Sequence, residues 1–295
     1  MIEVFNTHRR LLFGIAYRMI GQVGEAEDVL QEVWLRWQKQ DPAVIQSAQA
    51  WLVSATTRLC IDRLRSARHQ RESYYGVWLP EPLAPDTATD GAHAAELADS
   101  LGMAFMLMLE ALGPADRAVF LLREVFDYDY AEIAAIVGKS GAACRQIVSR
   151  AKTTLRAPVT TPVAQAPTEQ ARQLVETFLA ATASGDIDAV LALLTADSRL
   201  LSDGAGKVRA AGLPILGADR ISRFLLGVWP RFVGLTERRR IDINGAPGLL
   251  MTLDGQVQYA FSFEIADDRV RAIYIICNPD KLRHLGRLAP SADPS

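Results

Sequence analysis

The sequence predicts a multidomain protein in which two all-α helical domains precede an α+β domain. Three observations carry this prediction. Apolar residues recur at helical spacing through residues 1–70 and 96–156. Proline-containing stretches at 72–95 and 157–167 separate these regions from each other and from the remainder. Beyond them, short segments alternate apolar with polar or smaller residues, as half-buried strands do.

The first domain, residues 1–71, is expected to contain three helices. Apolar residues from Leu11 to Met19 define the first. The second runs from about Glu25 to Lys39 and has acidic residues in its first turn, where the helix dipole favours them. Pro42 breaks the next segment, and a third helix runs from about Ala48 to His69.

Charged side chains on the second and third helices indicate two kinds of partner. An acidic face with an aromatic residue fits a protein–protein contact; its members are Asp28, Gln31, Glu32 and Trp34. Arginines beside aromatic residues suit a partly single-stranded nucleic acid, because bases stack while arginines hold phosphates. This basic set contains Trp51, Arg58, Arg63 and Arg65, with Asp62 opposing it. Two solvated helix faces, with Trp51 in the core, remain the alternative.

The segment 72–95 favours a linker, because its prolines and glycines exclude a regular helix through most of it. It is not purely flexible. Trp78, Leu79 and Leu83 are apolar enough to dock onto another part of the protein.

The second helical domain, residues 96–156, ends in a helix-turn-helix pattern. Helices are expected at Glu96–Leu112, from Pro114 to about Val125, at about Tyr130–Val137 and from about Ala142 to Arg156. The last two flank the turn GKSG, as in a DNA-binding helix pair.

The last helix presents side chains that suit DNA. Arginine can pair with guanine, glutamine with adenine, and lysine with phosphate. The outward set is Arg145, Gln146, Ser149, Arg150 and Lys152. Ser140 precedes the helix and can cap it, which places backbone N–H groups near a phosphate. An ordinary helical hairpin with a solvated basic face is the alternative.

The third domain, residues 168–285, is followed by a flexible tail at 286–295. Helices are expected at 168–184, 186–194 and Ala218–Val228, and strands at RRIDING, GLLMTLDG, QVQYAFSFEIA and RVRAIYIICN. The turns Asn244-Gly245, Asp254-Gly255 and Asp267-Asp268 separate these strands, which favours an antiparallel curved sheet.

Several classes of protein are disfavoured by composition. The net charge of -2 excludes a polybasic nucleic-acid coat. Cys60, Cys144 and Cys277 are far apart and lack zinc spacing, so we expect reduced thiols, no metal and no cofactor. No signal peptide and no long apolar span is present in the sequence, so a cytoplasmic protein without a membrane segment is expected.

Two blocks of sequence resemble a known family. GEAEDVLQEVWLRW and AWLVSATTRLCIDRLRSARHQR resemble region 2 of extracytoplasmic-function (ECF) sigma factors of the sigma-70 family. LGPADRAVFLLREVFDYDYAEIAAIVGKSGAACRQIVSRAKTTLR resembles their region 4, and together the blocks cover about residues 1–156. The resemblance implies a non-enzymatic alternative sigma factor of the stress-response type. Such a protein binds core RNA polymerase and directs promoter-specific transcription initiation.

The resemblance also implies residue roles. Asp28, Gln31, Glu32 and Trp34 would contact the beta-prime clamp helices, and the beta flap would be a second polymerase contact. The loop Asp41–Gln49, with Arg58, Asp62, Arg63 and Arg65, would capture and melt the −10 element, beside Trp51. The helix carrying Arg145, Gln146, Ser149 and Arg150 would read the −35 element in the major groove.

Three further motifs resemble a subgroup of these sigma factors with a fused SnoaL-like domain: WLPEPL at 78–83, SDGAGK at 202–207 and NPDKL at 278–282. Ala205 interrupts the middle motif, which is usually richer in glycine. The resemblance implies a cone-shaped domain of helices over a curved sheet, in the nuclear-transport-factor-2-like class.

Regulation in cis is the first hypothesis for this domain, through a contact with region 2 and the linker. The contact would involve Trp78, Leu79, Pro80, Glu81, Pro82, Leu83, Asp203, Lys207, Asn278, Pro279, Asp280 and Lys281. Catalysis or small-ligand sensing in the cone is the second, with Asp203, Asp242 and Glu264 as the candidate acids. For the whole chain, the alternative is a regulator that binds duplex DNA without polymerase.

Overall fold

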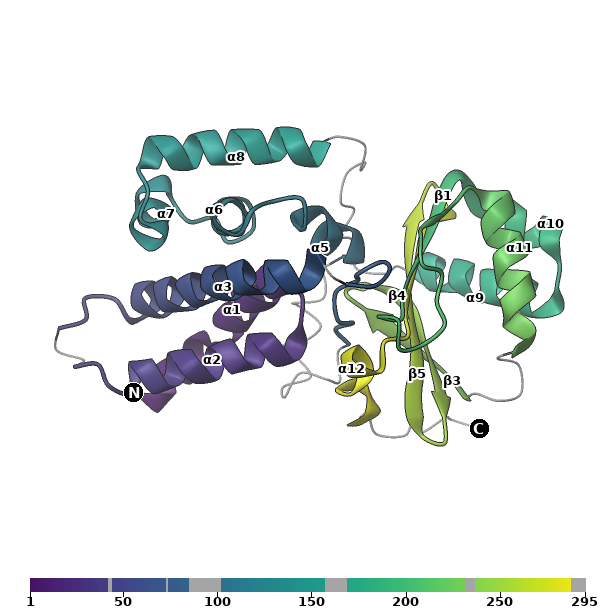
Figure 1. Ribbon diagram of the computed structural model, residues 1–295, viewed down its shortest axis with the longest axis horizontal. Helices are drawn as coiled ribbons and strands as arrows, with labels where there is room; N and C mark the ends of the chain where they lie inside the picture. The colour runs from purple at the N-terminus through teal and green to yellow at the C-terminus, as the bar shows by residue number, and fades with distance from the viewer. Residues whose placement is uncertain (42–43, 73, 85–101, 157–168, 232–236, 288–295) are drawn as a thin grey trace. The chain divides into compact units, whose positions relative to one another are not determined.

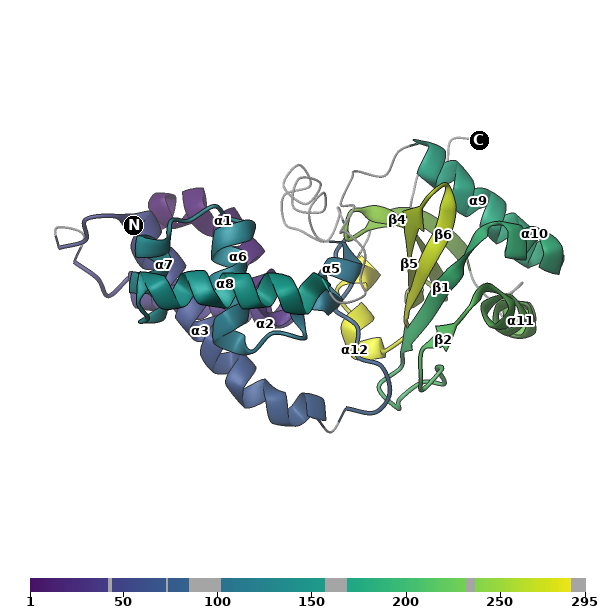
Figure 2. The same ribbon diagram turned by 90° about the horizontal axis from the view of Figure 1, so that it is seen from above.

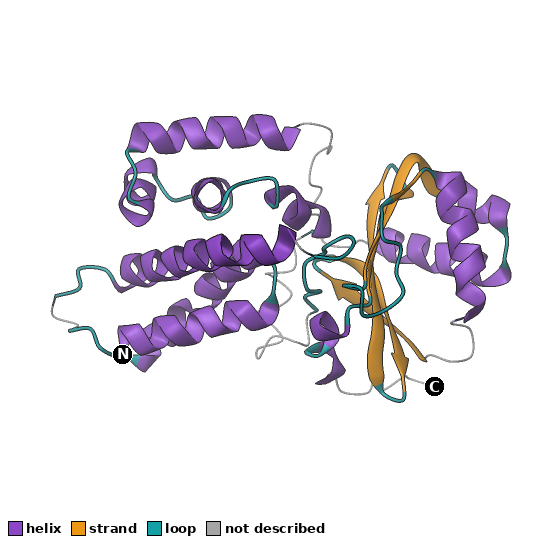
Figure 3. Cartoon of the chain, in the orientation of Figure 1, coloured by secondary structure: helices purple, strands orange, loops and turns teal. Residues whose placement is uncertain are grey.

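The computed structural model describes residues 1–41, 44–72, 74–84, 102–156, 169–231 and 237–287. The chain divides into two compact units (Figures 1 and 3). One unit contains Met1–Ser73 and Phe105–Thr161, and the other contains Tyr74–Ala104 and Pro162–Ser295. The WLPEPL segment therefore belongs to the same unit as the C-terminal domain.

Three helices open the first unit: α1 (Ile2–Ile20), α2 (Val23–Trp37) and α3 (Ala48–Glu72). Helix α1 ends at Gly21, whose φ of 76° is left-handed and whose N–H bonds the carbonyl of Tyr17. Its apolar face packs on both α2 and α3. Leu12, Ala16 and Met19 are fully buried there, as the helical spacing predicted.

In the described part of the chain, α3 is followed in this unit by α5 (Met103–Leu109), α6 (Pro114–Glu124), α7 (Tyr130–Val137) and α8 (Gly141–Arg156). Residues 96–101 lie outside the described part of the chain. The helix expected to reach Leu112 ends at Leu109, and turns follow. Pro114 stands at the first position of α6, where its missing N–H costs no hydrogen bond.

Helices α6 and α7 pack against α1 and α3, so the two helical regions form one compact unit. Arg117 of α6 is buried at this contact. Its guanidinium donates to the carbonyl of Met19 over 2.7 Å and pairs with Glu110 at 2.8 Å. Arg18 lies over the ring of Phe126 at 5.1 Å. Cationic side chains with polar and aromatic partners thus join the regions, in addition to apolar packing.

The second unit contains a six-stranded sheet in the order β2-β1-β6-β5-β4-β3. The strands are β1 (Leu194–Asp203), β2 (Ile215–Leu216), β3 (Glu237–Ile243), β4 (Ala246–Leu253), β5 (Gln256–Ala266) and β6 (Arg269–Ile276). Gly248 of β4 is required by close packing, because a Cβ there would lie 2.6 Å from the Phe261 carbonyl oxygen.

Helices α9 (Glu169–Ser184), α10 (Ile187–Ala192) and α11 (Ala218–Val228) cover one face of this sheet (Figures 1 and 2). The core between them contains Phe178, Phe261, Phe263, Ile273 and Trp229. The short helices α12 (Pro279–Leu282) and η3 (Leu285–Arg287) follow β6, and α12 lies on the opposite face in Figure 1. Two helical regions followed by an α+β domain of helices over a sheet confirm the predicted fold class.

The four predicted strands, β3 to β6, pair antiparallel as expected. The helix expected at 186–194 ends at Ala192, and β1 follows it without having been predicted. The whole sheet is mixed, because β1 pairs with β6 in parallel. The polar run in the first half of β1 hides its alternation, and its partner strand lies some 70 residues away. Local periodicity therefore could not reveal it.

The three cysteines are free and buried. No helix in the described ranges is long and apolar enough to cross a membrane.

Candidate functional site

Helix α2 presents the predicted acidic face, but its aromatic residue is less available than expected. Asp28 and Gln31 are exposed, and Glu32 is half-buried. Trp34 is also half-buried, because its ring packs against Phe5 at a centroid distance of 5.1 Å. Trp34 is therefore only partly exposed on this acidic face.

Arg63, predicted among the −10 contacts, faces α2. Its guanidinium lies 2.6 Å from Glu25, 3.7 Å from Glu32 and 3.9 Å from Asp28. Three carboxylates of α2 therefore surround this cation, so Arg63 of the basic helix α3 pairs with the acidic face of α2. Asp62 and Arg65 are exposed and pair with each other at 3.4 Å.

Arg58 is engaged within the first unit. Its Nε donates to the carbonyl of Ile136 over 2.9 Å, and its Nη2 donates to that of Ala135 over 3.0 Å. These carbonyls belong to the last turn of α7, where helix geometry leaves them without intrahelical partners. The predicted −10 side chain thus caps the first helix of the helix-turn-helix. Trp51 is half-buried against Trp37, with ring centroids 5.3 Å apart.

Helices α7 and α8 form the helix-turn-helix, and its apolar seam is buried. The seam contains Ile133, Ile136, Cys144, Ile147, Val148, Ala151 and Leu155. The Oγ atom of Ser140 accepts a hydrogen bond from Ala143 N–H at 3.1 Å, so this serine caps α8. Gly138, with a φ of 69°, ends α7 in the left-handed conformation.

The outward face of α8 keeps most of its predicted side chains exposed: Arg145, Gln146, Ser149 and Arg150. Lys152 is exposed as well, but its ammonium pairs with Glu124 of α6 at 2.7 Å. A DNA phosphate must compete with that carboxylate for Lys152.

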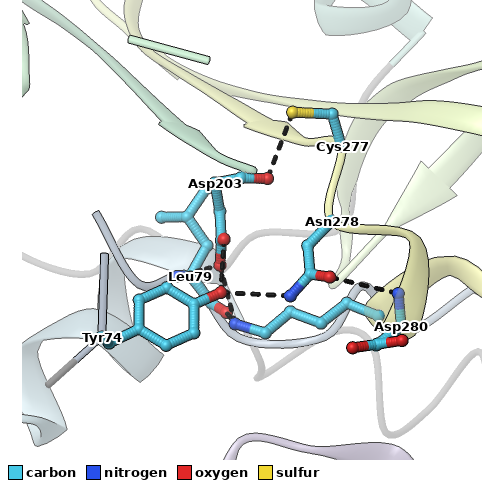
Figure 4. A network of polar contacts seen from close by, with 7 residues as sticks. Tyr74, Leu79, Asp203, Cys277, Asn278 and Asp280 are labelled. Atoms are coloured by element: carbon cyan, nitrogen blue, oxygen red, sulfur yellow. Dashed lines mark hydrogen bonds and ion pairs between the residues drawn. The ribbon is translucent and has the colours of Figure 1, made fainter. Parts of the chain in front are cut away.

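In the second unit, the linker is bound by Asp203, the last residue of β1 (Figure 4). One carboxylate oxygen, Oδ2, accepts hydrogen bonds from Leu79 N–H at 2.9 Å and from Lys281 Nζ at 2.7 Å. The other accepts from the Tyr74 hydroxyl at 2.6 Å. Lys281 also donates to the carbonyl of Leu79, and Asn278 Nδ2 donates to the Tyr74 oxygen at 3.1 Å. We call Tyr74, Leu79, Asp203, Asn278 and Lys281 the linker clamp.

The linker clamp buries its charges and pairs them. Asp203 is 0% and Lys281 4% exposed. The ammonium lies 4.4 Å from the ring centre of Trp78 and 5.1 Å from that of Tyr74. Burial and the hydrogen bond to Asp203 raise the pKa of Tyr74, so its hydroxyl stays protonated and donates. A buried ion pair with its polar atoms satisfied fixes one geometry.

A second set of bonds holds the end of the WLPEPL motif. Leu83 N–H donates to Asn244 Oδ1 at 3.0 Å, and Asn244 N–H donates to the Leu83 carbonyl at 2.8 Å. His284 Nε2 lies 2.7 Å from the Pro82 carbonyl oxygen. Leu79, Pro80, Pro82 and Leu83 are buried. The linker is therefore docked through backbone and side chains.

The structure brings together most of the predicted regulatory residues and adds three. Trp78, Leu79, Pro82, Leu83, Asp203, Asn278 and Lys281 meet in the docked linker. Lys207 and Asp280 form an exposed ion pair beside it, while Glu81 is half-buried and Pro279 exposed. Sequence reasoning missed Tyr74, Asn244 and His284. The sequence around Asn244 predicted only the turn Asn244-Gly245. No residues next to Tyr74 or His284 in the sequence indicated that either side chain would take part in holding the linker.

The candidate acids for catalysis are engaged in structural bonds. Asp242 pairs with Arg172 at 2.8 Å. Glu264 accepts from the Tyr274 hydroxyl at 2.7 Å and pairs with Arg199 and Arg271. Burial alone raises the pKa of Glu264, but hydrogen bonds from Tyr274 and Arg271 lower it overall. Neither acid is arranged as a general acid. Within the residues that the structure describes, no His, Cys, Asp and Glu group could hold a metal ion.

Comparisons with known proteins agree with this architecture. The family profile described as Sigma-70 region 2 matches residues 4–70, and that described as Sigma-70, region 4 matches residues 102–155. The ECF RNA polymerase sigma factor SigJ of Mycobacterium tuberculosis is 37% identical over 290 residues, covering 95% of this chain and 92% of that protein. A probable ECF RNA polymerase sigma factor of the same species, SigI, is 30% identical over 283 residues, covering 94% and 93%.

A solved structure extends the likeness to the whole fold. The crystal structure of the Mycobacterium tuberculosis extracytoplasmic function sigma factor SigJ matches with a TM-score of 0.77 at 32% identity. The match covers 96% of this chain and 99% of that one.

Region 2 and region 4 helices, joined to a helix-over-sheet domain, define a transcription initiation factor of the sigma-70 type. The chain belongs to the extracytoplasmic-function sigma factors of this family and acts in promoter-specific transcription initiation. Sigma factors are not enzymes, so the family membership confirms the prediction of a non-enzymatic protein.

Proposed function

We propose that the C-terminal domain regulates this sigma factor in cis by binding the linker between region 2 and region 4. The observation that carries the proposal is the linker clamp, in which Asp203 and Lys281 bind both the N–H and the carbonyl of Leu79. The linker joins α3 to α5, so docking it changes how far the two DNA-binding regions can separate.

The polymerase and promoter contacts follow the exposed surfaces of the first unit. The acidic face of α2 binds the beta-prime clamp helices in the cytoplasm, chiefly through Asp28 and Gln31, with Glu32 and the edge of Trp34. The −35 element is read by α8 through Arg145, Gln146, Ser149 and Arg150. The beta flap is a second polymerase contact near region 4. The exposure of Asp28 and Gln31, and of the four side chains on α8, supports the assignment.

Binding of the −10 element requires region 4 to leave region 2. The two promoter elements lie about 25 base pairs apart, or about 85 Å at roughly 3.4 Å per base pair. In the first unit α7 instead contacts α3 directly through Arg58. On opening, Arg58 becomes available to the −10 element beside Trp51, Asp62, Arg63 and Arg65. The compact unit is therefore the state before promoter binding.

The reach of the linker gives docking a physical effect. From Glu72 to Met103 an extended chain spans at most about 100 Å, at roughly 3.3 Å per residue. When residues up to Ala84 are docked, their length is fixed, and only the stretch from Ala84 to Met103, at most about 65 Å by the same measure, remains free to extend. Docking therefore limits the separation between regions 2 and 4 that the linker can accommodate.

Transcription with purified core polymerase tests this proposal. Start sites are mapped first for the full chain, and then for chains ending after Arg156 and after Asp280. The second truncation removes Lys281 and His284 but keeps the sheet. We expect promoter-specific output to change in both, and equal output from all three chains would contradict cis regulation. Failure of the full chain to bind core polymerase would contradict the polymerase assignment.

A small ligand of the C-terminal domain is a second candidate function. A hollow of about 280 Å³ lies between Tyr75 and the loop Gly204–Gly212, with Lys207 and Arg209 in its lining. It adjoins Tyr74 and Asp203 in sequence, so an occupant would favour the docked linker. Thermal denaturation against a library of small anions tests it, because a ligand of the folded state raises the melting temperature.

A further inference from the structure

We infer that Tyr130 is a positioning residue for −35 recognition and sets base selectivity by orienting Arg145. The inference rests on the proposed role of α8 in reading the −35 element. Tyr130 lies on α7 rather than on the recognition helix. Its influence on DNA is therefore exerted through Arg145.

The backbone around Tyr130 is held rigidly, because this residue is the first of α7 and follows a capping box. Asp129 Oδ1 accepts hydrogen bonds from Ala131 N–H and Glu132 N–H, both at 2.8 Å. Glu132 Oε2 accepts the Asp129 N–H at 2.9 Å. These reciprocal bonds fix the start of the helix and with it the position of the aromatic side chain.

The ring of Tyr130 contacts two guanidinium groups. Arg123 lies 5.2 Å and Arg145 lies 5.6 Å from its centroid. Arg123 is itself held, since it donates to the Tyr128 carbonyl at 2.9 Å and pairs with Asp127 at 3.3 Å. The ring is thus a fixed platform on which the Arg145 guanidinium rests.

Arg145 differs from Arg58 and Arg63 in leaving its N–H donors unused. Within the described part of the chain, no hydrogen bond or ion pair engages its guanidinium, whereas Arg58 and Arg63 are engaged by carbonyls or carboxylates. Its N–H donors remain available for a base edge. The cation–π contact restrains the side chain without consuming a donor.

This restraint matters because arginine reads guanine by two parallel hydrogen bonds that need one orientation. A free arginine samples many rotamers and must be ordered on binding. An arginine held by a cation–π contact is partly ordered before it binds. At an exposed site a cation–aromatic contact corresponds to about a 2- to 5-fold effect on binding. We therefore expect the ring to sharpen selectivity at the base that Arg145 contacts.

The experiment uses the full chain with core polymerase and a promoter library randomised at the −35 element. Arg145→Ala identifies the position that Arg145 reads, because preference there disappears. Tyr130→Leu should weaken the preference at that same position about 2- to 5-fold. Tyr130→Phe should retain it, since it keeps the ring. In the Arg145→Ala background, Tyr130→Leu should add nothing.

Tyr130→Trp guards against a folding defect in the leucine variant, because the indole ring binds cations better and should maintain or sharpen the preference. Equal loss at every −35 position with Tyr130→Leu, or unchanged selectivity in a folded leucine variant, would overturn the inference. If Arg145→Ala alters no position while Gln146→Ala or Arg150→Ala does, the inference fails and the assignment of α8 stands. If none of these three variants alters a position, the assignment of α8 fails as well.

Discussion

The ammonium group of Lys281 lies 2.7 Å from the carboxylate of Asp203, and both side chains are buried. These residues are far apart in sequence and meet at the end of β1 and in α12. Asp203 accepts a hydrogen bond from the Leu79 N–H, and Lys281 donates one to the Leu79 carbonyl. The Asp203–Lys281 pair of the C-terminal domain therefore holds the linker, which begins immediately after region 2.

Removing one member of this pair should be costly. Lys281→Met leaves the Asp203 carboxylate buried without its cation, so we expect a loss of about 3–5 kcal/mol in the free energy of unfolding of the second unit. Urea denaturation followed by the fluorescence of the tryptophans measures it. The double variant Asp203→Leu with Lys281→Met should recover part of the loss, because no unpaired charge remains.

The matched control is the exposed pair between Lys207 and Asp280, whose side chains are 53% and 40% exposed. Lys207→Met should cost less than about 1 kcal/mol, since solvent screens exposed ion pairs. Equal losses in the free energy of unfolding for Lys207→Met and Lys281→Met would show that burial does not make the Asp203–Lys281 pair more important for stability than an exposed ion pair.

Arg58→Ala should destabilise the contact between α3 and α7. It removes two hydrogen bonds from a charged donor to the Ala135 and Ile136 carbonyls, for which we expect a loss of about 2 kcal/mol. Hydrogen exchange of the α7 amides in the free protein should accelerate accordingly. Arg65→Ala is the control, because that side chain is exposed and should leave the exchange unchanged.

Arg63 should couple energetically to α2. A double-mutant cycle between Arg63→Met and Glu25→Gln isolates the 2.6 Å pair. We expect a coupling of about 0.5–1 kcal/mol, decreasing with salt, because the side chains are partly exposed. A coupling of zero at low salt would indicate that Arg63 is free for DNA in the unbound protein.

His284 should make the docked linker sensitive to acid. Burial lowers the pKa of His284, and the hydrogen bond to the Pro82 carbonyl only partly opposes this effect. A lowered pKa means that the folded state prefers the neutral ring. Stability is therefore complete above the ordinary histidine pKa of about 6.5, and it falls as the pH drops through the lowered value.

Melting temperatures measured from pH 7.5 down to about pH 5 test the pH dependence. His284→Gln should flatten the part of the profile below about pH 6.5, since the amide does not titrate. An unchanged slope in this variant would assign the acid sensitivity to other groups.

Much of the architecture could be predicted from short-range patterns. Helix α11 was predicted with its observed bounds, and β5 was recognised from alternation at Tyr259, Phe261 and Phe263. The exposed set on α8 followed from its helical period, since the opposite face had to be apolar. Strand β1 escaped prediction, because its role depends on a parallel partner far along the chain.

The candidate site divides in the same way. The motifs containing Leu79, Asp203 and Lys281 were recognised from sequence. That Asp203 binds the N–H and Lys281 the carbonyl of the same residue, Leu79, was not predicted. Tyr74 and Asn244 were missed for the same reason. Arg58 and Arg63 were predicted to contact the −10 element, and the structure shows that both also bind groups of neighbouring helices.

The sequence by itself determined which segments are helical, which strands are half-buried and which faces carry charge, because these properties repeat every two or 3.6 residues. The tertiary structure alone decided the partners of those charges. Hydrogen bonds and ion pairs act over a few ångströms between residues far apart in the chain. Only tertiary packing places Asp203 beside Lys281, where they bind the linker, and Arg58 beside α7, where it caps the last turn of that helix.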